Sequence, residues 1–385
     1  MNFLVFFVSI AHFTVDFFAD IFQPLIPFFM QKYAITDQPK TLVLMASVLS
    51  MTASMSQLII GYYTDRSSKK LILIYFFVVF SIFPGFFMGY APNLTYLFLI
   101  FLIGYIANAA QHPLGASIAG HVGKGKSLTL AFYVLGGTFG SGLGPIVITW
   151  YVKNFGIENT WAIGLIMFVM FSILTLYAYK YLKNNEILKP SSNTASLLQV
   201  IKSLKVLYPI WILTVCRSFI SSLFHMYGPI RTNSMGYDLT VGGLMLSSAL
   251  ISGMFSNMLG ARIYERHGIK KLNVLSFSGY TVFLLMFALS KNMIFIALSF
   301  VLADIFMFFT MSANVSYAQK ILPQFRGVAS GALMGFAWAC GNLIVMAFSL
   351  VFGNNIEFMI NSLWFFAAIG VILTFILFRK KTILT

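Results

Sequence analysis

The chain has 385 residues, of which 59% are apolar, 17% aromatic and only 9% charged. A water-soluble domain carries roughly 25% charged residues, so this composition excludes a soluble protein and indicates a chain that is solvated mainly by lipid. The net charge of +15 does not indicate a nucleic-acid partner, because basic residues accumulate in the cytoplasmic loops of membrane proteins.

Twelve apolar stretches are long enough to form a helix across the hydrocarbon core of a bilayer, which needs roughly 20 residues. They are 4–30, 42–63, 71–90, 94–119, 128–152, 161–182, 207–230, 241–263, 272–289, 293–318, 328–352 and 358–378. The first has no basic n-region and is too long for a signal peptide, so we expect it to be retained. The sequence predicts an all-α polytopic membrane protein with twelve transmembrane helices.

The basic residues predict the orientation of these spans. With a cytoplasmic N-terminus, 19 of the 25 basic residues fall in inner loops or the C-terminal tail, five fall outside and Arg217 lies within a span. This asymmetry follows the positive-inside rule. We therefore expect both termini to be cytoplasmic.

The longest polar interruption, residues 183–206, predicts a cytoplasmic linker between an N-terminal six-helix bundle, 1–182, and a C-terminal one, 207–385. An acid–Arg pair followed by Lys–Lys recurs 200 residues apart, after the second and eighth spans. The residues concerned are Asp65, Arg66, Lys69 and Lys70, and Glu265, Arg266, Lys270 and Lys271.

The first and seventh spans, which correspond under this repeat, both contain residues that disturb helices. They are Pro24 and Pro27 in the first span, and Gly228 and Pro229 in the seventh. Internal repeats with interrupted helices in matching positions indicate a secondary transporter with its site near the bilayer midplane.

One face of the first span is polar, since His12, Asp16 and Asp20 follow one another at four-residue intervals and Gln23 continues the face. An ionisable group inside a bilayer costs at least about 2.5–3.5 kcal/mol, which makes a functional role the default. We expect Asp16, near the middle of the membrane, to be a protonation site together with His12 and His112. The alternative is a permanently charged Asp16 paired with a cation.

His112 also has a structural alternative, because it precedes Pro113. A proline inside a helix frees a backbone carbonyl one turn earlier, which a polar side chain can satisfy.

Arg217 lies near the middle of the seventh span, His225 lies two turns further out on the same face, and Asp304 lies near the middle of the tenth. A guanidinium stays charged and binds phosphonate, phosphate or carboxylate oxygens through two parallel hydrogen bonds. We expect Arg217 to recognise an anionic substrate; the alternative is a fixed ion pair with Asp304 or Asp16. Other residues expected to line the substrate site are Asp20, Gln23, Asn108, Gln111, His225 and Asp304.

The fifth span contains a strip of small residues, which lets helices approach closely. It consists of Gly136, Gly137, Gly140, Gly144 and Pro145.

Six plus six spans with the repeated acid–Arg–basic loop resemble the major facilitator superfamily, over the whole chain. Shorter motifs resemble the bacterial fosmidomycin-resistance-type exporters within it. They are His12-Phe13-x-x-Asp16 before Pro24-x-x-Pro27, Gly61-Tyr-Tyr-Thr-Asp65, His112-Pro113, and Gly136-Gly137-x-Phe139-Gly140-Ser-x-Leu-Gly144-Pro145. This resemblance implies the major facilitator fold, with two six-helix bundles, and export of a phosphonate antibiotic in exchange for protons.

Two further features are interpreted through this resemblance. Gly140-x-x-x-Gly144-Pro145 is similar to the superfamily's antiporter signature, although Ile148 and Thr149 replace the usual trailing glycines, and simple helix packing is the alternative. The charged loop residues are expected to hold a cytoplasmic gate closed. They are Asp65, Arg66, Lys69, Lys70, Glu265 and Arg266.

We therefore expect a proton-coupled exporter of a small anionic or amphiphilic compound, such as a phosphonate antibiotic, that works by alternating access and gives drug resistance. The alternative is an importer or facilitator of a nutrient anion, or a lipid-handling transporter. Cys216 and Cys340 show no metal or disulfide spacing, and no catalytic constellation is present, so we expect no cofactor, no bound metal and no enzyme activity. We expect a monomer in the bacterial cytoplasmic membrane.

Overall fold

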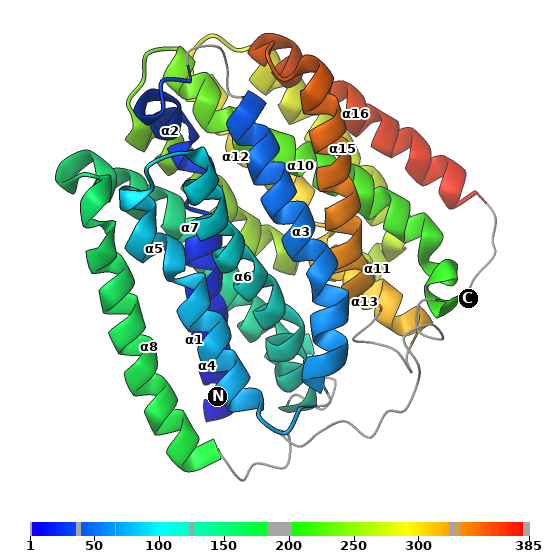
Figure 1. The fold of residues 1–385 in the computed structure, drawn as a ribbon. Helices are drawn as coiled ribbons and strands as arrows, with labels where there is room; N and C mark the ends of the chain where they lie inside the picture. The colour runs from blue at the N-terminus through cyan, green and yellow to red at the C-terminus, as the bar shows by residue number, and fades with distance from the viewer. Residues whose placement is uncertain are drawn as a thin grey trace.

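A computed structural model describes residues 2–35, 40–65, 67–122, 127–182, 202–322, 329 and 331–379, and these residues contain helices and no strands (Figure 1). The helices of the first half are α1 (Phe3–Ala19), η1 (Gln23–Leu25), α2 (Ile26–Lys32), α3 (Lys40–Asp65), α4 (Lys70–Ser81), α5 (Phe83–Phe87), η2 (Met88–Tyr90), α6 (Leu94–Val122), α7 (Ser127–Phe155), η3 (Ile157–Thr160) and α8 (Trp161–Leu182). Those of the second half are η5 (Leu204–Leu207), α10 (Tyr208–Ser234), α11 (Leu239–Leu289), α12 (Met293–Phe308), α13 (Met311–Ile321), the π-helical η7 (Ala332–Phe336), α15 (Ala337–Phe352) and α16 (Ile356–Leu377).

Ten helical stretches in the described residues are long and apolar enough to cross a membrane. The all-α polytopic class is therefore confirmed, whereas the predicted count of twelve is not. One difference is α11, a continuous stretch of 51 residues that covers two predicted spans and leaves helical geometry only at Gly268, where φ is 81°. The other is α3, which has 26 residues but is not among the ten.

Local sequence explains where several helices begin or break. Asn2, Asn292 and Asn355 each accept a hydrogen bond from a backbone N–H in the first turn of α1, α12 and α16, the usual role of an N-cap. Pro24 lies in the short 3₁₀ helix η1, which separates α1 from α2. Pro229, by contrast, lies inside α10 without ending it.

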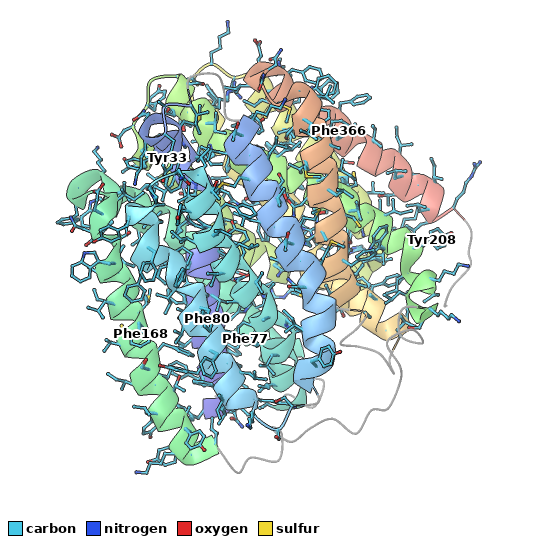
Figure 2. All side chains as sticks on the ribbon, viewed as in Figure 1. Tyr33, Phe77, Phe80, Phe168, Tyr208 and Phe366 are labelled. Atoms are coloured by element: carbon cyan, nitrogen blue, oxygen red, sulfur yellow. The ribbon has the colours of Figure 1, made fainter. Side chains whose placement is uncertain are left out.

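The outer surface of the molecule is apolar, as contact with lipid requires. Along α8, the side chains of Ile166, Met170, Ile173 and Leu176 are all exposed. Figure 2 shows Phe80 on the surface of the first half, and this ring is also exposed. An uninterrupted apolar surface of this kind would aggregate in water.

Helix α3 of the first half and α15 of the second half lie side by side (Figure 1). A second contact between the halves joins α7 and α11. There the Ile146 N–H, next to Pro145, donates to Ser247 Oγ at 3.0 Å. Most of the predicted linker, 183–206, lies outside the described residues.

A salt bridge also joins the halves. Lys153 Nζ in the last turn of α7 lies 3.0 Å from Asp238 Oδ2. Asp238 is the N-cap of α11, and hydrogen bonds from the side chain and backbone of Thr240, with the bond from Lys153, lower its pKa to about 2. By the predicted orientation, this bridge lies on the outer side of the membrane.

The lowered pKa of Asp238 predicts a pH-dependent contribution to stability. A carboxylate whose folded pKa lies below its unfolded value of about 3.9 stabilises the fold above that value and loses this contribution as the pH falls through its folded pKa. Asp238→Asn keeps an N-cap residue but removes the charge. We expect it to lower the free energy of unfolding near neutral pH by less than about 1 kcal/mol, because both groups are half exposed. The thermal unfolding midpoint should fall accordingly.

The difference in midpoint between Asp238→Asn and the wild type should then shrink as the pH falls toward the folded pKa. A difference that stays constant over that range would contradict this assignment.

Candidate functional site

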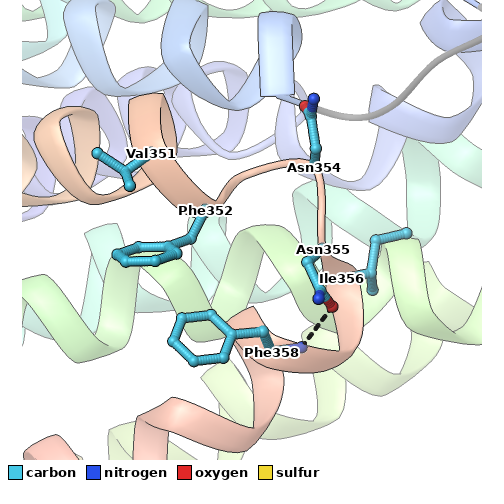
Figure 3. A pocket seen from close by; sticks show the side chains of 6 residues that line it. All are labelled: Val351, Phe352, Asn354, Asn355, Ile356 and Phe358. Carbon is cyan, nitrogen blue, oxygen red and sulfur yellow. Dashed lines mark hydrogen bonds between the residues drawn. The ribbon is translucent and has the colours of Figure 1, made fainter.

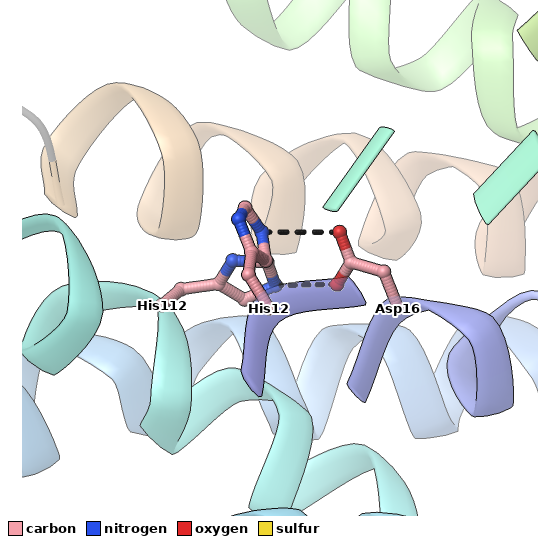
Figure 4. Close-up of side chains that lie close together, drawn as sticks. All are labelled: His12, Asp16 and His112. Atoms are coloured by element: carbon pink, nitrogen blue, oxygen red, sulfur yellow. Dashed lines mark ion pairs between the residues drawn. The ribbon is translucent and has the colours of Figure 1, made fainter. Parts of the chain in front are cut away.

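A buried carboxylate on α1 lies between two imidazoles (Figure 4). His12 Nε2 lies 3.1 Å from Asp16 Oδ2, and His112 Nε2, from α6, lies 3.3 Å from Asp16 Oδ1. Asn108, one turn before His112, donates from Nδ2 to Asp16 Oδ1 at 2.8 Å. We call these four residues the Asp16 cluster. The structure brings Asp16, His12 and His112 together as the sequence predicted, and it adds Asn108, which the sequence placed in the substrate site.

The hydrogen-bond geometry of His12 determines how many protons the Asp16 cluster needs. His12 Nδ1 lies 2.9 Å from the backbone carbonyl of Tyr133, and a carbonyl oxygen only accepts, so Nδ1 carries a hydrogen. If His12 were neutral, its Nε2 would be a bare acceptor facing a carboxylate. The contact with Asp16 therefore requires one further proton, either on the imidazole or on the carboxyl group.

Packing orders this cluster and excludes most water from it. The ring of Tyr133 stacks on His12 with centroids 4.2 Å apart, and the two imidazoles meet edge to face at 4.8 Å. The side chains of Asp16 and His112 remain 13% and 20% exposed. A group that is nearly dry but still reached by water can exchange a proton, which a sealed group cannot do easily.

The glycine strip of α7 makes room for this arrangement. A Cβ atom at Gly136, Gly140 or Gly144 would collide with a backbone carbonyl oxygen of α1, so α7 lies directly against the backbone of α1. A Cβ at Gly137 would instead collide with His12 Nε2 and Asp16 Oδ2. Gly137 therefore leaves the space that the His12–Asp16 contact occupies.

Polar groups are also buried in the second half. His225 Nε2 on α10 lies 2.9 and 2.8 Å from the two carboxylate oxygens of Asp304 on α12. Arg217, two turns before His225, is buried, and its guanidinium lies 5.2 Å from the ring centroid of Trp338. Among the described residues, the Nε and Nη1 atoms of Arg217 have no hydrogen-bond partner.

Both carboxylates that the sequence offered as partners for Arg217 are already held by imidazoles, Asp16 by His12 and His112, and Asp304 by His225. A buried donor without a partner costs about 1–3 kcal/mol, and more when it is charged. The unpartnered guanidinium is therefore a strong candidate for binding an anion.

The other residues predicted to line the substrate site lie on α1, η1 and α6 or at their ends. Asp20 ends α1, and its charge interacts with Asp16 and, across the boundary between the halves, with His225. Gln23 begins η1. Gln111 is fully buried on α6, and neither atom of its amide has a partner in the described part of the chain.

The predicted gate residues are only partly visible. Arg66 and the side chain of Asp65 lie outside the described residues. Lys69 is the N-cap of α4, and Lys70, the first residue of that helix, is buried. In the second half, Glu265 and Arg266 are exposed on α11 just before the break at Gly268.

The same geometry also suits a metal ion, because one ligand atom each from His12, Asp16 and His112 lie within 4.8 Å of one another. The sequence predicted no bound metal. A proton satisfies the contacts without any added ion, so we interpret the Asp16 cluster as a proton site.

A small surface pocket lies at the turn between α15 and α16 (Figure 3). Asn355 there accepts a hydrogen bond from the Phe358 N–H at 2.9 Å and so caps α16. None of its lining residues belongs to the groups described above, and we assign it no function.

Three contributing residues were not predicted from the sequence. Tyr133 acts through its backbone carbonyl and the face of its ring, which no motif reveals. Tyr280, on α11, is buried, and its hydroxyl has no hydrogen-bond partner among the described residues. Trp338 could have been found from the sequence. Tryptophan is enriched at the membrane interfaces, whereas Trp338 lies ten residues into the predicted eleventh span.

Two helical halves with an apolar outer surface and buried ionisable groups define a polytopic membrane protein of the transporter class, not an enzyme. The family profile described as Major Facilitator Superfamily matches residues 8–346. The chain belongs to this superfamily.

Known proteins agree with this assignment. The chain is 22% identical to the fosmidomycin resistance protein of Escherichia coli (strain K12) over 96% of its own length and 91% of that protein, which confirms the predicted resemblance. It is 21% identical to an uncharacterised transporter of Bacillus subtilis (strain 168), YfnC, over 88% of this chain and 84% of that protein.

Solved structures support the fold alone. The nucleoside transporter NupG superposes with a TM-score of 0.77 at 15% identity, covering 98% of this chain and 99% of NupG. The D-xylose-proton symporter superposes with a TM-score of 0.72 at 12% identity, covering 98% and 97% of the two chains.

Gly137 gives a test of the Asp16 cluster. We predict that Gly137→Ala lowers the transport rate at least tenfold while the protein still folds, because the new methyl group displaces flexible side chains and not backbone; tenfold corresponds to about 1.4 kcal/mol. Gly142→Ala is the matched control, since its methyl group would meet Ile251 Cγ1 and not the cluster. Equal transport by the two variants, at equal amounts of folded protein, would contradict this role.

Proposed function

We propose that the protein is a proton-coupled exporter of a small anionic compound, of the phosphonate class, across the bacterial cytoplasmic membrane. The observation that carries the proposal is the extra proton that the contact between His12 and Asp16 requires. A membrane potential supplies about 2.3 kcal/mol per charge per 100 mV, so a proton moving inward can drive a solute outward.

In the proposed cycle, the Asp16 cluster takes up a proton from the outside while the outer ends of the two halves are apart. The halves then rock against each other, and the proton leaves on the cytoplasmic side. Because a proton on the cluster changes the charge near the substrate site, its loss or gain shifts the affinity for an anion.

Arg217 supplies the proposed substrate contact. Its Nε and Nη1 atoms have no partner among the described residues, and either of them can donate together with Nη2 to two oxygens of one phosphonate or carboxylate group. The face of Trp338 helps to hold the guanidinium plane. The polar residues proposed to line the rest of the site are Asp20, Gln23, Asn108, Gln111 and His225, with Asp304, which is 0% exposed, behind His225.

The similarity to a protein named for fosmidomycin resistance supports both the phosphonate class and the outward direction. We propose that it works as a monomer with both termini in the cytoplasm. The charged loops after the second and eighth spans would form the cytoplasmic gate, and the salt bridge between Lys153 and Asp238 would help to close the outer side.

Asp16→Asn tests the coupling. Asparagine has nearly the same shape but cannot bind or release the proton, so we expect fosmidomycin accumulation driven by a pH gradient in inverted vesicles to fall at least tenfold, while exchange of labelled for unlabelled compound continues. Glu357→Gln, an exposed acidic residue in the first turn of α16, is the control and should transport normally.

If Asp16→Asn used the pH gradient to accumulate fosmidomycin at the wild-type rate, the proton role of Asp16 would be refuted. Loss of wild-type transport on adding a chelator would instead identify a metal ion at the cluster. Accumulation only under the opposite pH gradient would show import.

Arg217 is tested by the dependence of transport on fosmidomycin concentration. We expect Arg217→Gln to raise KM at least tenfold, since hydrogen bonds to a charged group contribute about 1.5–3 kcal/mol. The KM of Arg217→Lys should lie between those of the wild type and Arg217→Gln, because lysine keeps the charge but loses the paired donors. Arg262→Gln, at an exposed position of α11, is the control. An unchanged KM in Arg217→Gln would exclude substrate contact.

A further inference from the structure

A second pair of ionisable groups lies in the other half of the molecule. The carboxylate of Asp304 is 0% exposed and receives His225 Nε2 at 2.8 Å, whereas the His225 side chain is 11% exposed. A solute cannot reach Asp304 without breaking this contact. A proton can reach the pair through the imidazole, since an imidazole whose Nε2–H donates to Asp304 still has Nδ1 as an acceptor.

The surroundings of the pair are mostly aromatic. Phe224 stacks on Phe300 with ring centroids 4.1 Å apart, and the imidazole lies beside both rings. Such an environment makes a change of charge on the pair energetically important, because few water molecules screen it.

The charged or titratable groups whose charges interact with the pair come from three helices. Arg217 lies on the same helix as His225, Tyr280 comes from α11, and Asp20 comes from α1 in the opposite half. Asp20 is the one member of this set that belongs to the first half.

The two halves show the same arrangement with the residue types exchanged. In the first half, α1 carries Asp16 and α6, the fourth predicted span, carries His112. In the second half, α10, the seventh span, carries His225 and α12, the tenth, carries Asp304. Under the internal repeat these are corresponding helices, and each half therefore joins its first and fourth spans through one aspartate–histidine contact.

We propose that the His225–Asp304 pair is a second proton-binding site, so that one transport cycle moves two protons. This inference rests on the proposed proton-coupled function and adds to it. Protonation transfers a proton from hydronium in the solvent to Nδ1, which leaves water and converts the neutral imidazole to an imidazolium, and the carboxylate of Asp304 balances the new charge.

The proton site itself is tested without any substrate. The chain has five histidines, so nitrogen-15 NMR of histidine-labelled, purified protein can follow each imidazole as the pH is varied between about 5 and 9. His225→Gln assigns the signal, and if this variant does not fold, replacing the other four histidines one at a time assigns it by elimination. His267→Gln, at an exposed position of α11, is the control and should remove one signal while leaving that of His225 unchanged.

We expect the His225 imidazole to gain one proton within that range. Asp304→Asn should shift the midpoint by at least one pH unit toward acid, and Asp20→Asn should shift it by less in the same direction. A His225 imidazole that keeps one protonation state throughout, in the wild type and in Asp304→Asn, would overturn the proposal and leave a fixed structural pair.

The stoichiometry is tested in proteoliposomes, from the membrane potential at which net fosmidomycin flux reverses at a fixed pH gradient. We expect two protons per cycle for the wild type and one for His225→Gln. One proton per cycle in both would overturn the proposal. If fosmidomycin is not transported at all, the proposed function fails, and the NMR result still decides whether the second proton site exists.

Discussion

The arrangement of the first half depends on one hydrogen bond, from His12 Nδ1 to the backbone carbonyl of Tyr133. This bond fixes the tautomer of the imidazole and turns its other nitrogen toward Asp16. The pair then needs a proton that neither group supplies when both are in their usual states, the imidazole neutral and the carboxyl ionised. In the proposed function, helix packing thereby creates a binding site for one proton in the apolar interior.

The same packing links this site to movement of the halves. The glycines of α7 bring that helix onto α1, where Gly137 leaves room for the Asp16 cluster, and further along α7 the Ile146 N–H contacts α11 of the second half. Asp20, one turn beyond Asp16, interacts with His225 across the boundary. A change in how the halves meet therefore alters the surroundings of ionisable groups on both sides, which is the requirement for coupling a proton to a conformational change.

The sequence predicted much of this because apolar length and helical periodicity are local properties. The four-residue spacing of His12 and Asp16, and the depth of His112 in an antiparallel helix, were sufficient to bring the three side chains together. The partners of Asp304 and Arg217 were harder to predict from the sequence, since they depend on how each helix is rotated about its axis. Charge alone suggested an Asp304–Arg217 pair as one alternative, whereas the structure places His225 against Asp304.

Other features lie beyond any reading of local sequence. Tyr133 contributes a backbone carbonyl, which every residue has, and only the packing of α7 on α1 selects that one. The count of twelve spans is not confirmed, since α11 runs as one element through the loop expected near Gly268, where its backbone leaves helical geometry.

The central claim, that a proton on the Asp16 cluster and an anionic substrate influence each other's binding, is tested most directly by counting protons during binding. Purified protein in weakly buffered detergent solution, mixed with fosmidomycin in the presence of a pH-sensitive dye, should show a change in bound protons for the wild type and a smaller change for Asp16→Asn. Fosmidomycin binding with no proton exchanged at any pH between about 5 and 9 would contradict the account.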